Sequence, residues 1–167
     1  MSKKIMIDAG HYTDYNRSCV YSKYCEGNMT WKLQKYLKEE LESYGFIVST
    51  TRKSRDKDLE LFDRGYKAKG YDLFLSLHSN AAETENVDRV VVIKGYDQPN
   101  TLAKKLAIAI SDVMPVTQNY QIYTRQKSNK EEWYGVLRGA KAAGVANRFI
   151  LEHGFHTNTK IAKWLYK

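Results

Sequence analysis

The chain has 167 residues, of which 43% are hydrophobic, and a formal net charge of +8 at pH 7. This length suits a single domain, since most domains contain about 100 to 150 residues. No apolar run reaches the roughly 18 residues that a membrane-spanning helix needs, so we expect no membrane insertion. The positive charge fits either a solvated lysine-rich surface or attraction to an anionic polymer such as nucleic acid or a cell wall.

Neither the N-terminus nor the cysteines indicate an exported disulfide scaffold. The apolar residues Ile5–Ile7 are followed at once by Asp8, whereas a signal peptide needs an apolar region of about 7 to 15 residues. We therefore expect synthesis in the cytoplasm without a signal peptide. Cys19 and Cys25 are too few for a disulfide framework and match no zinc knuckle, so we expect both to be reduced bystanders.

In the first half of the chain, short apolar runs alternate with helical periodicity. Strands are predicted over residues 4–8, 46–50 and 71–77. Between the first two, leucines at helical spacing predict a helix that Asn28 caps and Gly45 ends. A second helix is predicted over residues 58–69. The residues expected to face the core from this helix are Leu59, Phe62 and Tyr66.

The second half repeats this alternation. Strands are predicted over residues 89–93 and 147–152, and a helix begins at Pro99 with an apolar face. Residues 139–145, which contain two glycines and several small side chains, are predicted to form a loop. Strands that alternate with helices predict a single α/β domain with a largely parallel sheet.

Three predicted strands lead into a possible ligand or acid, namely His11, His78 and Glu152. In parallel sheets, functional groups gather where strands end and loops begin. A catalytic zinc ion needs about three protein ligands and an open position for water. His11 and His78 can supply two ligands, and an acid near residue 26 can supply the third. A single histidine after a strand is more often structural, but two of them with an acid nearby favour a metal site.

The motifs around these residues resemble a known family. The segments are Asp8–His11, Glu26–Asn28, a strand running into His78–Ala81, and Leu151–Asn158. In this order they resemble the zinc-dependent N-acetylmuramoyl-L-alanine amidases of the Amidase_3 type. In that family the third segment is a His-Ala-Asn-like motif, and the fourth has the form Val-Glu-x-Gly-Phe-x-x-Asn. The resemblance extends from residue 4 to residue 158.

The resemblance implies a fold, a reaction and a site. The fold is a mixed, mostly parallel sheet flanked by helices, with residues 1–167 forming the catalytic domain. The reaction is cleavage of the amide bond between N-acetylmuramic acid and L-alanine in bacterial peptidoglycan, on the cell wall after release. His11, Glu26 and His78 are implied as zinc ligands, and Glu152 as the catalytic acid/base.

The sequence departs from the family pattern in two places. Residues 12–16 replace a Gly-Gly-x-Asp-x-Gly continuation, and only a short helix fits residues 161–167, where the family has a long one. No C-terminal cell-wall-binding module is recognisable, so we expect this chain to be the catalytic portion of a larger lysin. The oligomeric state is left open, with a monomer as the default expectation.

Other interpretations of the same residues remain open. His153 and His156 could bind metal, although His153 should face the opposite side of the sheet from Glu152. Cys25 with His78 could form a cysteine hydrolase dyad. A basic module that binds nucleic acid or cell wall without catalysis is the non-enzymatic alternative. We do not expect nucleic-acid binding, because no helix carries a dense basic face aligned with aromatic residues.

Overall fold

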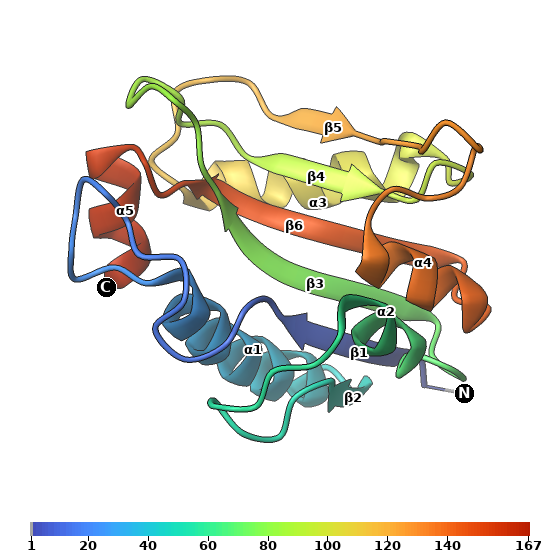
Figure 1. The fold of residues 1–167 in the computed structure, drawn as a ribbon. Helices are drawn as coiled ribbons and strands as arrows, with labels where there is room; N and C mark the ends of the chain where they lie inside the picture. The colour runs from blue at the N-terminus through green and yellow to red at the C-terminus, as the bar shows by residue number, and fades with distance from the viewer. Residues whose placement is uncertain (1) are drawn as a thin grey trace.

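The fold is a six-stranded sheet between two layers of helices (Figure 1). The structure is a computed structural model that describes residues 2–167. The strands are β1 (Lys4–Ala9), β2 (Ile47–Thr50), β3 (Leu73–Asn80), β4 (Val91–Lys94), β5 (Gln121–Tyr123) and β6 (Asn147–Phe155). The helices are α1 (Glu26–Ser43), α2 (Leu61–Tyr66), α3 (Asn100–Val113), α4 (Gly135–Ala142) and α5 (Thr159–Tyr166). Within the described part of the chain, no helix is both long enough and apolar enough to cross a membrane.

The strand order is β2-β1-β3-β6-β4-β5, and only the pairing of β4 with β6 is antiparallel. The expected mixed, mostly parallel α/β fold is therefore confirmed. Because β1, β3 and β6 are parallel neighbours, their carboxyl ends meet at one edge of the sheet. Polar groups in or just after the last few residues of these three strands are thus brought together, although they come from distant parts of the sequence.

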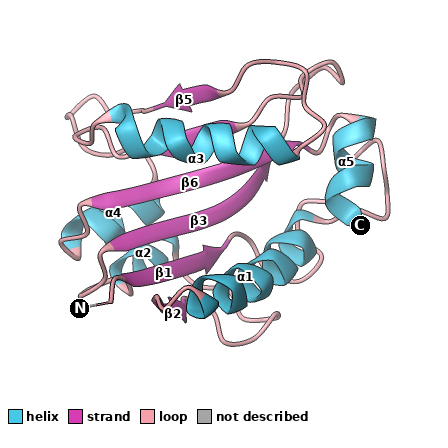
Figure 2. Ribbon diagram, turned by 180° about the vertical axis from the view of Figure 1, so that it is seen from behind, coloured by secondary structure: helices cyan, strands magenta, loops and turns pink. Residues whose placement is uncertain are grey.

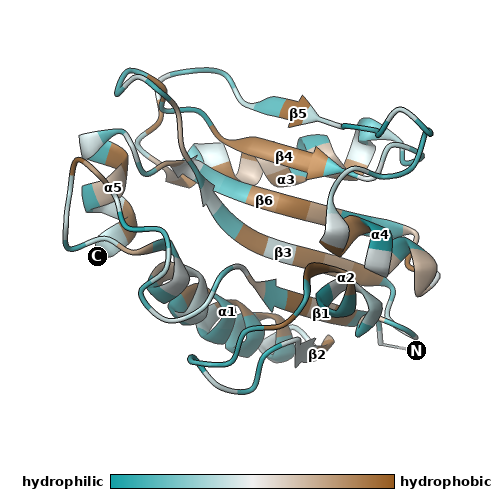
Figure 3. Cartoon of the chain, viewed as in Figure 1, coloured by the Kyte–Doolittle hydropathy of each residue, from teal (hydrophilic) through white to brown (hydrophobic). Residues whose placement is uncertain are grey.

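Each face of the sheet carries its own apolar layer. Helices α1 and α3 cover one face, over residues such as Ile7, Leu75 and Leu151 (Figure 2). Helices α2 and α4 lie on the other face, where the buried cluster includes Phe74 and Ile150. Successive strand residues alternate between these layers, as the pleat of a strand requires. Figure 3 shows the outcome, with hydrophobic residues concentrated along the central strands and hydrophilic residues in most of the loops.

The start of the first helix differs from the prediction. Helix α1 begins at Glu26 after Cys25, so the expected cap at Asn28 is wrong. Asn28 is the third residue of the helix, and its side chain links α1 to the neighbouring loops. Its Nδ2 donates a hydrogen bond to Asp14, and its Oδ1 accepts one from Arg55. The shift places Glu26 in the first turn, where its carboxylate is directed toward the sheet edge.

The prediction for the second helix is also wrong in its extent and in its inward face. Helix α2 is shorter than residues 58–69, and both Phe62 and Tyr66 are 43% exposed. The residues that it buries are Arg64 and Gly65. Leu59, the third residue expected to face the core, precedes the helix and is half-buried.

The predicted loop over residues 139–145 is mostly helix α4, and strand β5 was not predicted. Of the two glycines that suggested a loop, Gly144 follows the helix with a φ of +81°, whereas Gly139 forms a close contact between α2 and α4 together with Gly65. A Cβ atom on Gly65 would lie 1.9 Å from the carbonyl oxygen of Val136, and one on Gly139 would lie 1.9 Å from that of Phe62. The two helices therefore touch backbone to backbone, which only glycine allows.

We predict that Gly65→Ala destabilises the protein by about 1 to 3 kcal/mol, as overpacking does in well-packed sites. Urea unfolding followed by circular dichroism measures the loss. The control is Lys67→Ala at the exposed end of the same helix, which should stay within about 0.5 kcal/mol of wild type. Equal stability of the two variants would show that the helices separate at little cost.

Candidate metal centre and active site

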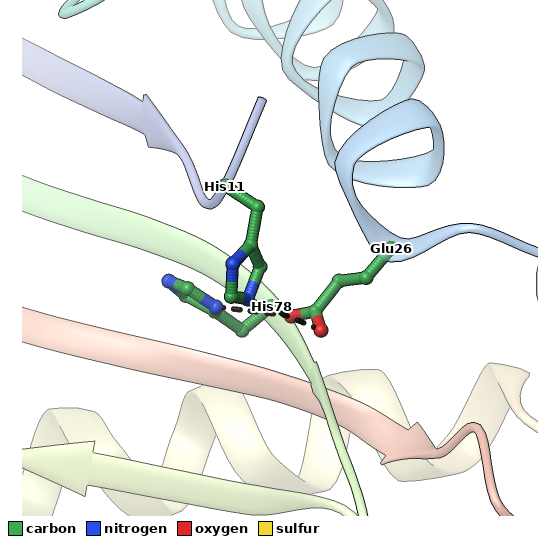
Figure 4. Close-up of side chains that lie close together, drawn as sticks. All are labelled: His11, Glu26 and His78. Carbon is green, nitrogen blue, oxygen red and sulfur yellow. Dashed lines mark hydrogen bonds and ion pairs between the residues drawn. The ribbon is translucent and has the colours of Figure 1, made fainter. Parts of the chain in front are cut away.

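His11, Glu26 and His78 converge at the carboxyl edge of the sheet (Figure 4). His11 lies in the turn after β1, Glu26 opens α1, and His78 lies in β3. One ligand atom from each residue can be chosen so that all lie within 4.8 Å of one another. His11 Nε2 is 3.2 Å from Glu26 Oε2, and His78 Nδ1 is 3.0 Å from Glu26 Oε1.

The sequence predicted that His78 follows the end of its strand. In the structure it lies within the strand, because β3 continues to Asn80. The turn after β1 packs closely against this strand, and the residue before His11 must therefore be a glycine. A Cβ atom on Gly10 would lie 2.2 Å from Cε1 of the His78 ring. Gly10 therefore lets the His78 imidazole lie directly against the backbone that carries His11.

The Glu26 carboxylate is buried and saturated with hydrogen-bond donors. Its side chain is 1% exposed. Besides the two histidines, the backbone N–H of Ser79 donates to Oε1 at 2.8 Å, and Asn16 Nδ2 donates to Oε2 at 2.5 Å. Sequence reasoning missed both Asn16 and Ser79, because neither residue type signals a contact across the fold.

The electrostatics of the cluster favour an ionised carboxylate. Burial by itself would raise the pKa of Glu26, but the hydrogen bonds and charges of His11 and His78 outweigh it and hold that pKa far below its usual range. Burial would lower the pKa of His78, but the hydrogen bond and charge of Glu26 raise it to about 9. Two imidazoles on one carboxylate form a donor set that fits zinc, with room for an open coordination position.

Glu152 stands next to this cluster on the neighbouring strand. In the parallel pairing of β3 with β6, Glu152 is directly opposite His78. Its Oε2 atom is buried, and no residue among positions 2–167 offers it a hydrogen bond. Burial, together with the charge of Glu26, raises the pKa of Glu152 to about 7 despite the opposing effect of His78. Such a carboxyl can both accept and release a proton at neutral pH.

The other candidate residues lie outside the three-residue cluster. His153 Nδ1 contacts the carbonyl oxygen of His78 at 3.0 Å, and the ring lies over the α1 and α3 face of the sheet. The expectation that it faces away from Glu152 is confirmed. His156 is 3.9 Å from Glu26, but its Nδ1 atom is bound to Ser79 at 2.9 Å.

The thiol of Cys25 has the wrong electrostatics for a nucleophile. The residue is buried, and burial raises the pKa of its thiol. A reactive cysteine needs the opposite shift, toward the thiolate. The structure therefore disfavours the dyad of Cys25 with His78.

A buried ion pair supports the turn that carries His11. Arg64 is 2% exposed, and its NH1 atom lies 3.3 Å from Oδ1 of the fully buried Asp8. The same guanidinium donates to the carbonyl oxygens of Ala9 at 2.8 Å and His11 at 3.1 Å. Thr51 and Ser76 complete the shell of Asp8 with hydroxyl donors at 2.6 and 2.7 Å.

A cavity of about 400 Å³ opens beside the cluster. Its walls include His11 and His78 from the candidate metal centre, and Tyr12, Leu61 and Arg64 from the surrounding loops and α2. The cavity gives a substrate direct access to the two histidines.

Comparisons with known proteins agree on one family and one fold. The profile of a family described as N-acetylmuramoyl-L-alanine amidase matches residues 5–167. A Staphylococcus epidermidis protein named "Probable cell wall amidase LytH" is 38% identical over 158 residues, which cover 93% of this chain and 49% of that protein. The chain thus spans about half the length of this relative.

Solved structures share the fold at low sequence identity. Cwp6 from Clostridium difficile superposes with a TM-score of 0.81 at 23% identity, covering 100% of this chain and 26% of that one. The catalytic domain of CwlV, an N-acetylmuramoyl-L-alanine amidase from Bacillus (Paenibacillus) polymyxa var. colistinus, gives a TM-score of 0.74 at 20% identity, covering 99% and 87%.

We predict that Asp8→Ala costs about 3 kcal/mol of unfolding free energy, because it removes the buried carboxylate that pairs with Arg64 and leaves only Asp58, whose side chain is 56% exposed, as a charged partner. Urea unfolding gives the value. Glu42→Ala, which removes a surface pair with Lys38, is the control and should cost about 0.5 kcal/mol or less. A loss below about 1 kcal/mol for Asp8→Ala would mean that water replaces the carboxylate.

Proposed function

The chain belongs to the N-acetylmuramoyl-L-alanine amidase family, and from this membership we propose that it hydrolyses the amide bond between N-acetylmuramic acid and L-alanine in bacterial peptidoglycan. The observation that carries the proposal is the His11–Glu26–His78 cluster beside a buried Glu152 carboxylate oxygen that has no hydrogen-bond partner within residues 2–167. An amide hydrolase needs a way to activate water and a group that moves protons, and this edge of the sheet offers both.

In this proposal His11, Glu26 and His78 hold a zinc ion. When bound, zinc lowers the pKa of a water molecule to about 7 and polarises the scissile carbonyl. Glu26 brings a negative charge that favours binding of the cation. The two histidines must be neutral to act as ligands, so metal uptake displaces the proton that Glu26 otherwise stabilises on His78.

Glu152 carries the proton transfers. Its carboxylate accepts a proton from the attacking water as the new carbon–oxygen bond forms. It then delivers that proton to the nitrogen of alanine, so that the carbon–nitrogen bond breaks and a neutral amine leaves. A pKa near 7, set by burial, suits a group that must perform both steps.

Residues 1–167 act as a catalytic domain on the bacterial cell wall. The net charge of +8 favours association with a wall polymer that carries phosphates and carboxylates.

The reaction is tested by analysing digested peptidoglycan. We predict that new amino groups of alanine appear in step with lysis, while no new reducing sugar ends form. A chelator should stop the reaction, and added zinc should restore it. Reducing ends that appear in step with lysis would identify a glycosidase, and full activity of a metal-free preparation would exclude the zinc mechanism.

The role of Glu152 is tested by Glu152→Gln, which keeps the shape of the side chain but cannot accept and release a proton. We predict a fall in turnover of roughly 10² to 10⁴-fold. Zinc content should stay at the wild-type value. As the pH falls below the pKa of Glu152, wild-type activity should decline because the base becomes protonated. A nearby zinc ion lowers this pKa, so the decline should begin at or below about pH 7.

Two matched variants separate ligation from proton transfer. His78→Ala should lose zinc, because two protein ligands seldom hold a catalytic ion. His153→Ala, on the next strand but facing the other way, should retain zinc. If Glu152→Gln loses zinc as His78→Ala does, Glu152 is a ligand and not the acid/base.

A further inference from the structure

Three buried side chains form a continuous hydrogen-bonded path beside Glu26. The hydroxyl of Tyr24 lies 2.6 Å from Oγ of Ser79, which lies 2.9 Å from Nδ1 of His156. Their exposed fractions are 1%, 4% and 3%. The Tyr24 and His156 rings also stack, with centroids 5.7 Å apart. These residues come from the segment before α1, from β3 and from the segment after β6.

Both contacts of the Ser79 hydroxyl lie within hydrogen-bonding distance. Because a hydroxyl can donate and accept at once, Ser79 Oγ bridges Tyr24 and His156 with either tautomer of the imidazole. Buried side chains that are paired in this way hold one another in fixed positions.

Ser79 connects this path to the candidate metal centre. Its backbone N–H donates to Glu26 Oε1, the same oxygen that His78 contacts. The Ser79 side chain is held from both sides, which fixes the direction of that N–H. His156 is itself anchored, because its carbonyl oxygen accepts from Ser18 Oγ at 2.6 Å and its N–H donates to Asn80 at 2.8 Å.

We infer that Tyr24, Ser79 and His156 are positioning residues that hold Glu26 in its metal-binding orientation before the ion arrives. The inference rests on the proposed function, because it takes Glu26 to be a zinc ligand. A carboxylate already fixed by outer hydrogen bonds loses little freedom on binding a metal. Outer partners of metal ligands typically contribute about 10- to 100-fold to metal affinity.

The test measures the zinc dissociation constant of the full 167-residue chain by competition with a chromophoric chelator. Ser79→Ala removes the hydroxyl and keeps the backbone N–H that Glu26 uses. Tyr24→Phe removes only the other hydroxyl. We predict that each variant weakens zinc binding about 10-fold or more, and that the double variant is weakened less than the product of the two effects.

The control separates positioning from simple stabilisation. Thr117→Ala removes a hydroxyl that donates to Asp88 at 2.6 Å, in the loop before β5. It should lower the melting temperature of the metal-free chain and leave zinc affinity unchanged. Ser79→Ala and Tyr24→Phe should lower both quantities.

Two results would overturn the inference in distinguishable ways. If Ser79→Ala and Tyr24→Phe bind zinc within twofold of wild type while their melting temperatures fall as in the control, the network is purely structural and the proposed function stands. If the wild-type chain itself binds no zinc, the proposed function falls and this inference falls with it.

Discussion

The buried pair of Arg64 with Asp8 is the contact on which the candidate site depends. Two charges removed from water are costly, and they are tolerated only where every donor and acceptor is satisfied. Here the Arg64 guanidinium, which α2 carries, also donates to the carbonyl oxygens of Ala9 and His11. These hydrogen bonds fix the backbone of the turn after β1. The backbone contact of Gly65 with α4 holds α2 in the position that this arrangement needs.

The pairing and the pleat of the strands decide which side chains reach the candidate site. Parallel pairing of β3 with β6 places Glu152 opposite His78, and the pleat directs His153 to the other face. One strand thus supplies both a residue for the proposed acid/base role and a histidine that stays out of the cluster. The shifted pKa of Glu152 follows from the same placement, because burial in the sheet edge is its largest cause.

Individual residues show where sequence reasoning succeeded and where it failed. His11, Glu26 and His78 were selected from motif order, and the structure brings them together. Asn28 was expected to cap a helix, but its side chain contacts Asp14 and Arg55, and the cap lies three residues earlier, at Cys25. Ser79 gave no signal at all, because a serine in a strand does not reveal which distant hydroxyl or imidazole it will meet.

The sequence by itself determined the α/β class, the positions of five of the six strands and the residues that could carry chemistry, because these depend on local periodicity and residue type. Only the tertiary structure decided that residues 139–142 are helical, since Gly139 is needed at a contact with α2 that no local pattern encodes. It also decided the antiparallel direction of β4 and the network around Glu26, because both depend on which distant segments become neighbours.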